Sequence, residues 1–262
     1  MIYKLYTFFF ARKIFFNLNR FLFKLSIHGL GLRNNSNQYL SGENAFIKKL
    51  IKNKSFENGV ILDVGANIGD YSIYIRENGV LAPIFAFEPH PQTYQQLISN
   101  TSNLNLTHLN LGLGDSTFET VIFDYKSNNG SQHASVYTEV IVDIHKSDVI
   151  ETKISVTTLD SIVEQYNIDN ITLLKIDTEG NELSVIKGAN KTIAASKIKY
   201  IQIEFNEMNV IAHTFLRDFM KLLPNYTFYR LLPNEMLEIK EYVPLYHELF
   251  AFQNIIAVNK NV

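Results

Sequence analysis

The 262-residue sequence contains no cysteine. Disulfide bonds, thiolate catalysis and cysteine-ligated zinc are therefore excluded. The N-terminal part lacks acidic residues. Residues 1–42 hold six of the 24 basic residues and none of the 26 acidic ones. The rest of the chain is acidic as a consequence. This charge distribution argues against broad binding to a nucleic-acid backbone, so we expect no nucleic-acid partner.

The N-terminal segment also lacks a long uncharged run. Residues 5–11 fall far short of the roughly 20 that a membrane-spanning helix needs, and no small-residue cleavage site of the signal-peptide type is present. The segment is rich in aromatic residues, and its polar residues at helical spacing form one stripe: Lys13, Asn17, Arg20 and Lys24. Two interpretations stay open. Residues 1–32 form either a basic amphipathic helix at a membrane interface or a helix that packs on the domain or on a second copy.

The remaining composition fits one globular domain. Hydrophobic residues make up 46% of the sequence, which is ample for the core of an α/β domain with additions. We expect an N-terminal helical segment over residues 1–42 and a single domain over 43–262. Gly29, Gly31 and the polar run 34–37 indicate a linker between the two.

Short apolar runs alternate with helical patterns through the domain. The predicted strands are 60–64, 84–87, 107–113, 118–123, 154–158, 173–176, 200–205, 227–231 and 254–258. The predicted helices are 42–53, 71–78, 93–100, 160–166, 182–195 and 210–223. This alternation predicts a Rossmann-like α/β fold, with a mostly parallel central sheet and helices on both faces. In such sheets ligands bind beyond the carboxyl ends of the strands.

The first predicted strand leads into a glycine-bearing turn at residues 63–70. Gly65 and Gly69 allow a tight turn and a close approach to a ligand, and Asp63 can bond the polar tail of a cofactor. Asn67 stands where the dinucleotide fingerprint has a glycine, so that fingerprint is incomplete. An ordinary strand-to-helix turn, with glycines for geometry only, is the less favoured alternative when this motif is taken alone.

The second and third strands each end in an acidic residue. Glu88 follows Gly65 by roughly the 20 residues at which an acid bonds both ribose hydroxyls. Asp115 is positioned to contact an adenine amino group. Together these residues indicate a nucleoside cofactor. A nicotinamide-dependent oxidoreductase stays open at this point, since Glu88 would suit any ribose.

More acids follow the next two strands. Asp177 and Glu179 come after strand 173–176, and Glu204 lies near the end of strand 200–205. If these strands are neighbours, the three side chains converge beside the cofactor. Helix capping by Asp177 or Thr178 is the structural alternative, and it accounts for one residue of the group.

Several of these side chains suit proton removal or metal binding. The candidate general bases are Asp177, His90 and His133. Asp177, Glu204 and His133 also form a possible ligand set for a divalent metal ion.

At these positions the sequence resembles the FkbM family of methyltransferases. The matching motifs follow in order at 60–72, 87–91, 112–116, 156–160, 173–189 and 203–206, and residues 175–180 are the most specific. The resemblance implies a class I methyltransferase fold, S-adenosylmethionine as donor and methylation of a hydroxyl. It also implies cofactor contacts at Asp63, Gly65, Asn67, Gly69 and Glu88, and a catalytic region at Asp177, Glu179 and Glu204.

The expected acceptor is a sugar, either nucleotide-linked or part of a cell-surface glycan precursor. A lipid-linked glycan or a polyketide-type metabolite is the alternative within the same enzyme class. A base methyltransferase is disfavoured, because Asp177 to Gly180 stand where such enzymes carry an Asn-Pro-Pro-Tyr-like element. A non-catalytic membrane-attached module fits the acidic motifs poorly. We expect a cytoplasmic protein, at the inner membrane face if the N-terminal segment binds lipid.

Overall fold

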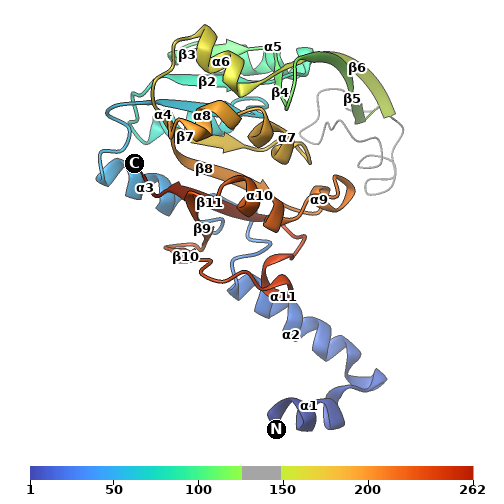
Figure 1. Ribbon diagram of the computed structural model, residues 1–262. Coiled ribbons are helices and arrows are strands. Elements are labelled where there is room, and N and C mark those ends of the chain that lie inside the picture. Colours follow the sequence, from blue (N-terminus) through green and yellow to red (C-terminus); the bar gives the residue numbers. More distant parts are fainter. Residues whose placement is uncertain (126–148, 262) are drawn as a thin grey trace.

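A computed structural model describes residues 1–125 and 149–261 and centres on one eight-stranded sheet (Figure 1). The strand order is β10-β9-β11-β8-β7-β1-β2-β3. Five strands run parallel: β3 (Leu106–Leu109), β2 (Ile84–Phe87), β1 (Val60–Val64), β7 (Ile171–Ile176) and β8 (Ile198–Phe205). Three antiparallel strands complete the sheet: β11 (Gln253–Asn259), β9 (Tyr226–Leu231) and β10 (Met236–Glu238). The predicted α/β fold with a mostly parallel sheet is confirmed.

Helices cover both faces of the sheet because its central strands are apolar on both sides. Every residue of β2 and β7 is buried. Neighbouring residues of a strand point to opposite faces, so Ile61 and Leu62 belong to two different core clusters. One face is covered by α3 (Glu43–Lys52) and α4 (Asp70–Glu77). The other is covered by α6 (Leu159–Gln165), α7 (Glu182–Lys187) and α10 (Leu216–Leu222).

A second, three-stranded sheet has the order β4-β6-β5. Its strands are β4 (Gly112–Leu113), β5 (Phe118–Tyr125) and β6 (Val149–Thr157). The single strand predicted over 107–113 is therefore wrong, since β3 and β4 belong to different sheets. Asn110 lies between β3 and β4, and its side chain donates hydrogen bonds to the backbone carbonyls of Glu88 and Pro89.

Two long predicted helices are each broken in two. The helix expected over 182–195 is α7 and α8 (Asn190–Ala194), and the chain at Gly188 packs directly on the backbone of Gly114. The helix expected over 210–223 is α9 (Met208–Ile211) and α10, with His213 at φ +50° between them. Helix α5 (Pro91–Asn100) follows β2 as predicted. The sequence did not predict β10 or α11 (Pro244–His247).

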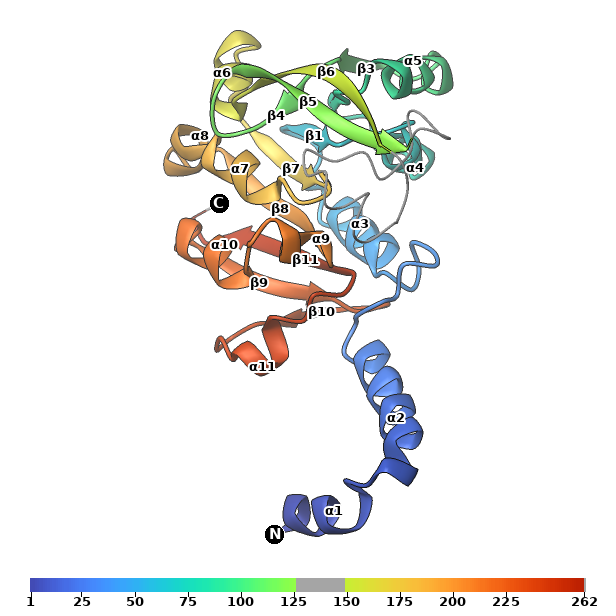
Figure 2. The same ribbon diagram turned by 90° about the vertical axis from the view of Figure 1, so that its right-hand side faces the viewer.

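The N-terminal segment is helical, as predicted, and extends away from the body of the protein (Figures 1 and 2). It consists of α1 (Ile2–Phe10), the short 3₁₀ helix η1 (Lys13–Phe15) and α2 (Phe16–Gly29). The chain joins the body after α2, where Leu32 is fully buried and the backbone N–H of Arg33 donates to the carbonyl of Phe252. No helix in residues 1–125 and 149–261 has the length and apolar character that crossing a bilayer requires.

Candidate active site

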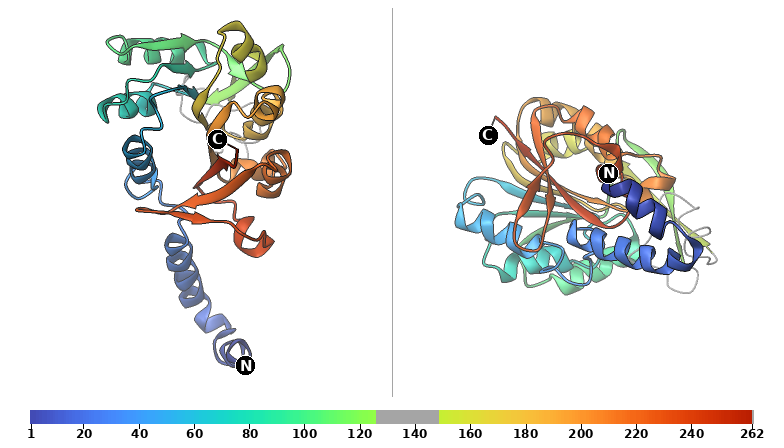
Figure 3. Two further views of the ribbon diagram at one scale, coloured as in Figure 1. Left: turned by 60° about the vertical axis from the view of Figure 1, so that its left-hand side comes forward. Right: turned by 90° about the horizontal axis from the view of Figure 1, so that it is seen from below.

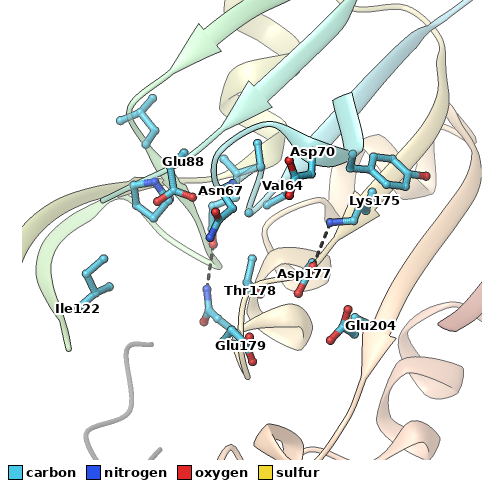
Figure 4. A pocket seen from close by; sticks show the side chains of 18 of the residues that line it. Val64, Asn67, Asp70, Glu88, Ile122, Lys175, Asp177, Thr178, Glu179 and Glu204 are labelled. Atoms are coloured by element: carbon cyan, nitrogen blue, oxygen red, sulfur yellow. Dashed lines mark hydrogen bonds and ion pairs between the residues drawn. The ribbon is translucent and has the colours of Figure 1, made fainter. Parts of the chain in front are cut away.

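The carboxyl ends of β1, β2, β7 and β8 open onto one pocket of about 410 Å³. This volume is within the roughly 300–1,000 Å³ of typical small-molecule sites. Figure 4 shows Glu88 and Asn67 at one end of the pocket and Asp177 and Glu204 at the other. The location is the one expected for a ligand in a sheet of this topology.

The turn after β1 is shaped by backbone conformations that favour glycine. Gly65 lines the pocket at φ +79°, and a β-carbon there would overlap the carbonyl oxygen of Asp177. Gly69, at φ +97°, is the N-cap of α4 and packs against Leu97 and Thr101 outside the pocket wall. Of the two glycines, therefore, Gly65 is positioned for ligand contact and Gly69 fixes the turn.

Glu88 follows β2 and lines the pocket in a largely buried position. Its two carboxylate oxygens accept hydrogen bonds from the backbone N–H groups of Asn67 and His90, at 3.0 and 2.8 Å. Burial raises the pKa of Glu88 to about 7. A carboxylate held at this strand end has the geometry and acceptor capacity to bond a ribose diol.

Two other predicted cofactor residues do not reach the pocket wall. Asp63 is fully buried, accepts a hydrogen bond from Ser72 at 2.7 Å and faces Lys175. Asp115 is exposed and accepts a hydrogen bond from the Ser116 hydroxyl. The structure thus places Asp63 behind the pocket and Asp115 beside it.

Lys175 lies at the centre of the acidic end of the pocket, inside the apolar strand β7. Its ammonium is 3.1 Å from Asp177 Oδ2 and 3.8 Å from Asp63 Oδ1, over the ring of Tyr71 at 5.0 Å. Burial alone would lower the pKa of Lys175, but nearby carboxylates, led by Asp177 and Asp63, raise it overall. Lys175 is therefore a cation at neutral pH. Sequence reasoning missed this role, although a lysine within an apolar strand and two residues before an aspartate is a visible signal.

The three predicted acids Asp177, Glu179 and Glu204 all line this pocket. They converge because β7 and β8 are neighbours, with Ile176 opposite Ile203. Burial, together with the charges of Asp177 and Glu179, raises the pKa of Glu204 well above its ordinary value. The Glu204 carboxylate also accepts a hydrogen bond from the Asn206 amide at 3.1 Å.

The side chain of Glu182 holds the loop that carries Asp177 and Glu179 through hydrogen bonds. One Glu182 oxygen accepts from Thr178 N–H, the Thr178 hydroxyl and Gly180 N–H, at 3.0 to 3.1 Å. The other accepts from the Asn209 amide. Neither Asp177 nor Thr178 caps α7, whose N-cap is Asn181, so the capping explanation is wrong. The buried carboxylate of Glu182 instead reaches back from the helix to the loop.

Part of the pocket wall comes from the segment that the sequence suggested was only a linker. Asn35, Asn37 and Gln38 line the pocket, followed by Ser41 and Glu43. Glu43 is anchored there by hydrogen bonds from Ser41 and from the Gln202 amide of β8. The contact between Glu43 and Gln202 joins residues far apart in sequence, which no local pattern indicates.

Of the two candidate histidines, the structure describes His90, which does not line this pocket. His90 is buried at the start of α5, where its Nδ1 accepts from Thr93 N–H at 3.4 Å. His133 lies outside the described residues. Within those residues no group of three or more His, Asp or Glu side chains is arranged to hold a metal ion.

Comparison with known proteins decides the family. The model of the methyltransferase FkbM domain matches residues 63–229, which is well over half of the chain. The chain belongs to the FkbM methyltransferase family. Members of this family are S-adenosylmethionine-dependent methyltransferases, and the sheet order of this chain is that of the class I fold.

Several curated relatives of this FkbM-domain protein are methyltransferases with distant sequences. Methyltransferase 1 of Beauveria bassiana is 26% identical over 50% of this chain and 59% of its own length. The hexuronic acid methyltransferase AglP of Haloferax volcanii is 29% identical over 64% of this chain and 64% of its own. For the 2-O-methyltransferase NoeI of Sinorhizobium fredii the values are 26%, 64% and 72%. The match thus spans less than two thirds of the first two relatives.

Solved structures of methyltransferases also align with the chain. A putative rRNA-methylase from Clostridium thermocellum aligns over 84% of this chain and 96% of its own, with a TM-score of 0.46 and 7% identity. A TehB-like SAM-dependent methyltransferase from Corynebacterium glutamicum aligns over 82% and 87%, with a TM-score of 0.42 and 11% identity.

The pocket fits the donor that the family uses. Its lining includes six acidic side chains (Glu43, Asp70, Glu88, Asp177, Glu179 and Glu204) against one basic side chain, Lys175, among the described residues. This excess of negative charge complements a cationic sulfonium. The second sheet adds an apolar wall for a flat base, formed by Leu113, Ile122, Ile154 and Val156.

Proposed function

We propose that this protein is an O-methyltransferase whose acceptor is a hydroxyl of a sugar, either nucleotide-linked or part of a cell-surface glycan precursor. The observation that carries the proposal is the gathering of Asp177, Glu179 and Glu204 at one end of the pocket, where Lys175 pairs with Asp177, while Glu88 lies at the other end. One end is suited to the nucleoside of the donor. The other offers carboxylates for the acceptor hydroxyl.

The bound S-adenosylmethionine supplies an activated methyl group, so the protein must position an alcohol and accept its proton. Glu204 is the better proton acceptor, because a carboxylate whose pKa is raised by burial is a stronger base than an ordinary carboxylate. Asp177 is paired with the Lys175 ammonium at 3.1 Å and accepts a hydrogen bond from the same hydroxyl. In this arrangement Asp177 orients the alcohol and Glu204 removes its proton.

The polar wall supports a hydroxyl-rich acceptor. Amide side chains both donate and accept hydrogen bonds, and five of them line the pocket: Asn35, Asn37, Gln38, Asn67 and Asn181. The names of two relatives, a hexuronic acid methyltransferase and a 2-O-methyltransferase, agree with this choice. A lipid-linked glycan would satisfy the same wall, whereas an apolar polyketide-type metabolite would offer these amides no further hydrogen bonds.

A divalent metal ion stays a separate prediction. Asp177 and Glu204 lie in the pocket, and the third predicted ligand, His133, is outside the described residues. Asp177 Oδ2 is already engaged by an ammonium at 3.1 Å, and a second cation there would be repelled. We therefore assign proton removal to the carboxylates and route no step through a metal.

The deciding experiment is transfer of labelled methyl from S-adenosylmethionine to a panel of nucleotide sugars, with and without a chelator. We expect label on a sugar oxygen, with turnover unaffected by the chelator. If no sugar is labelled although S-adenosylhomocysteine binds, the acceptor class is wrong and the enzyme class stands. Loss of turnover with the chelator, restored by a divalent ion, would replace the carboxylate mechanism with a metal-assisted one.

A further inference from the structure

The N-terminal arm, residues 2–25, carries the largest group of exposed apolar side chains among the described residues. No residue of α1 is buried, and α2 buries only Ile27, at its last turn. Ring and aliphatic side chains lie open to solvent along the whole arm: Ile2, Tyr3, Leu5, Tyr6, Phe8, Phe9, Ile14, Phe16, Leu18, Phe21, Leu22, Phe23 and Leu25. Figure 2 and the left panel of Figure 3 show the arm projecting clear of the body. A contiguous apolar surface of this kind marks an interaction site.

The apolar residues are distributed in a way that suits a bilayer interface. In α1 they surround most of the helix, and Lys4 and Thr7 form its polar side. In α2 a narrow polar stripe contains Asn17, Arg20 and Lys24. A helix with basic residues on a polar stripe and Phe and Leu elsewhere lies in the plane of a membrane interface.

The arm has a defined bend before any partner is present. The Tyr6 hydroxyl donates to Asn19 Oδ1 at 2.6 Å, and the Asn19 amide donates to the Phe10 carbonyl at 3.0 Å. The rings of Phe10 and Phe15 are 5.2 Å apart across the bend. These contacts fix α1 against the start of α2, so binding does not require the two helices to find their relative orientation.

Charge selects among the partners that an apolar arm could bind. The arm contains five basic residues and no acidic residue: Lys4, Arg12, Lys13, Arg20 and Lys24. Two copies of the arm would bring like charges together with no acid to offset them. An anionic bilayer offers both an apolar interior and negative headgroups, and it attracts each nearby Lys or Arg.

We propose that residues 2–25 dock the enzyme on an anionic membrane surface, with the aromatic rings in the headgroup region and the polar stripe of α2 facing water and lipid phosphates. The chain continues directly from α2 into the pocket wall at Asn35. Docking through the arm would hold the pocket near the membrane. This proposal does not depend on which acceptor the enzyme methylates.

Vesicle flotation of the full-length protein tests this proposal, because bound protein rises with the lipid while aggregates sink. We expect flotation with vesicles containing phosphatidylglycerol and little with pure phosphatidylcholine. Arg20→Gln with Lys24→Gln should reduce the apparent affinity at least tenfold, since each basic residue near the surface contributes about fivefold. Phe8→Ser with Phe21→Ser should abolish flotation.

Lys187→Gln with Lys191→Gln is the matched control, because it removes two exposed charges from the body. This control should float as the unchanged protein does, and all variants should bind S-adenosylhomocysteine equally. Equal flotation with both lipids, or an equal loss in the body control, would overturn the proposal. Dimers that depend on the arm, without any vesicle binding, would assign the surface to a second copy instead.

Discussion

Gly65 and Asp177 touch through their backbones, so the turn after β1 and the acidic loop after β7 form one packed unit. The Asp177 N–H donates to the Val64 carbonyl at 3.0 Å, and no β-carbon fits at position 65 beside the Asp177 carbonyl. The cofactor end and the acidic end of the pocket are therefore coupled in position. A change in either loop displaces the other.

This contact predicts that Gly65→Ala damages the enzyme more than strain alone would. A positive φ costs a non-glycine residue about 1–3 kcal/mol, and here an overlap with backbone is added. We expect at least a tenfold loss of S-adenosylhomocysteine affinity by calorimetry. Gly79→Ala is the matched control, because Gly79 has φ +80° with open space around it. Equal effects of the two variants on binding would show that the contact is unimportant.

Glu88 predicts a pH dependence of cofactor binding. Its pKa is raised to about 7 by burial, so the group is mostly protonated at pH 6 and ionised at pH 8. Ribose hydroxyls donate to the ionised form, and affinity should therefore rise by up to about tenfold between these pH values. Glu88→Gln should bind weakly at both. A flat profile in the unchanged protein would contradict this role.

Asp177→Asn should abolish turnover while leaving cofactor affinity within about threefold. The variant keeps the side-chain shape but removes the charge that faces Lys175 at 3.1 Å. Asp177 orients the reacting alcohol, and misplacing a reactant by about 1 Å can cost about 10²-fold, so we expect kcat to fall by at least that factor. Asp169→Asn is the control, since it removes a surface carboxylate paired only with Lys197 among the described ion pairs. Full activity of Asp177→Asn would remove this residue from the mechanism.

Lys175 predicts a shift in the pH profile. Its charge lowers the pKa of Glu204, against burial and two negative neighbours that raise it. Lys175→Met should therefore raise that pKa and move the acidic limb of the kcat/KM profile to higher pH. Lys175→Arg keeps the charge and should restore the limb. A lysine with a purely structural role would change stability in both variants and leave the profile in place.

Glu182→Gln tests the support beneath the acidic loop. The carboxylate accepts hydrogen bonds from Thr178, Gly180 and Asn209, and an amide NH₂ would face donors instead. Losing such bonds to a buried charged group costs about 1–3 kcal/mol, measurable by urea unfolding. We expect a fall in kcat as well. Glu164→Gln changes an exposed acid on α6 and should do neither.

Sequence patterns predicted the parts of the site that depend on local structure. Apolar runs identified β1, β2, β7 and β8, and the acids at their ends had to meet once those strands were neighbours. The breaks at Gly188 and His213 escaped prediction, because they depend on tertiary contacts and turn geometry rather than on periodicity. The pocket wall around Asn37 escaped for the same reason, since the position of a polar loop is set by what it folds against.

The junction after α2 determines how rigidly the N-terminal arm is attached to the body of the protein. The last turn of the helix is tied to the next residues, with the Leu32 N–H donating to the Ile27 carbonyl. Arg230, itself bonded to Gln253, reaches the Leu30 carbonyl from the sheet. These contacts hold α2 rigidly to the sheet. A surface that binds α2 therefore also fixes the orientation of the sheet. The opening of the pocket would then have one fixed orientation relative to any surface that α2 binds.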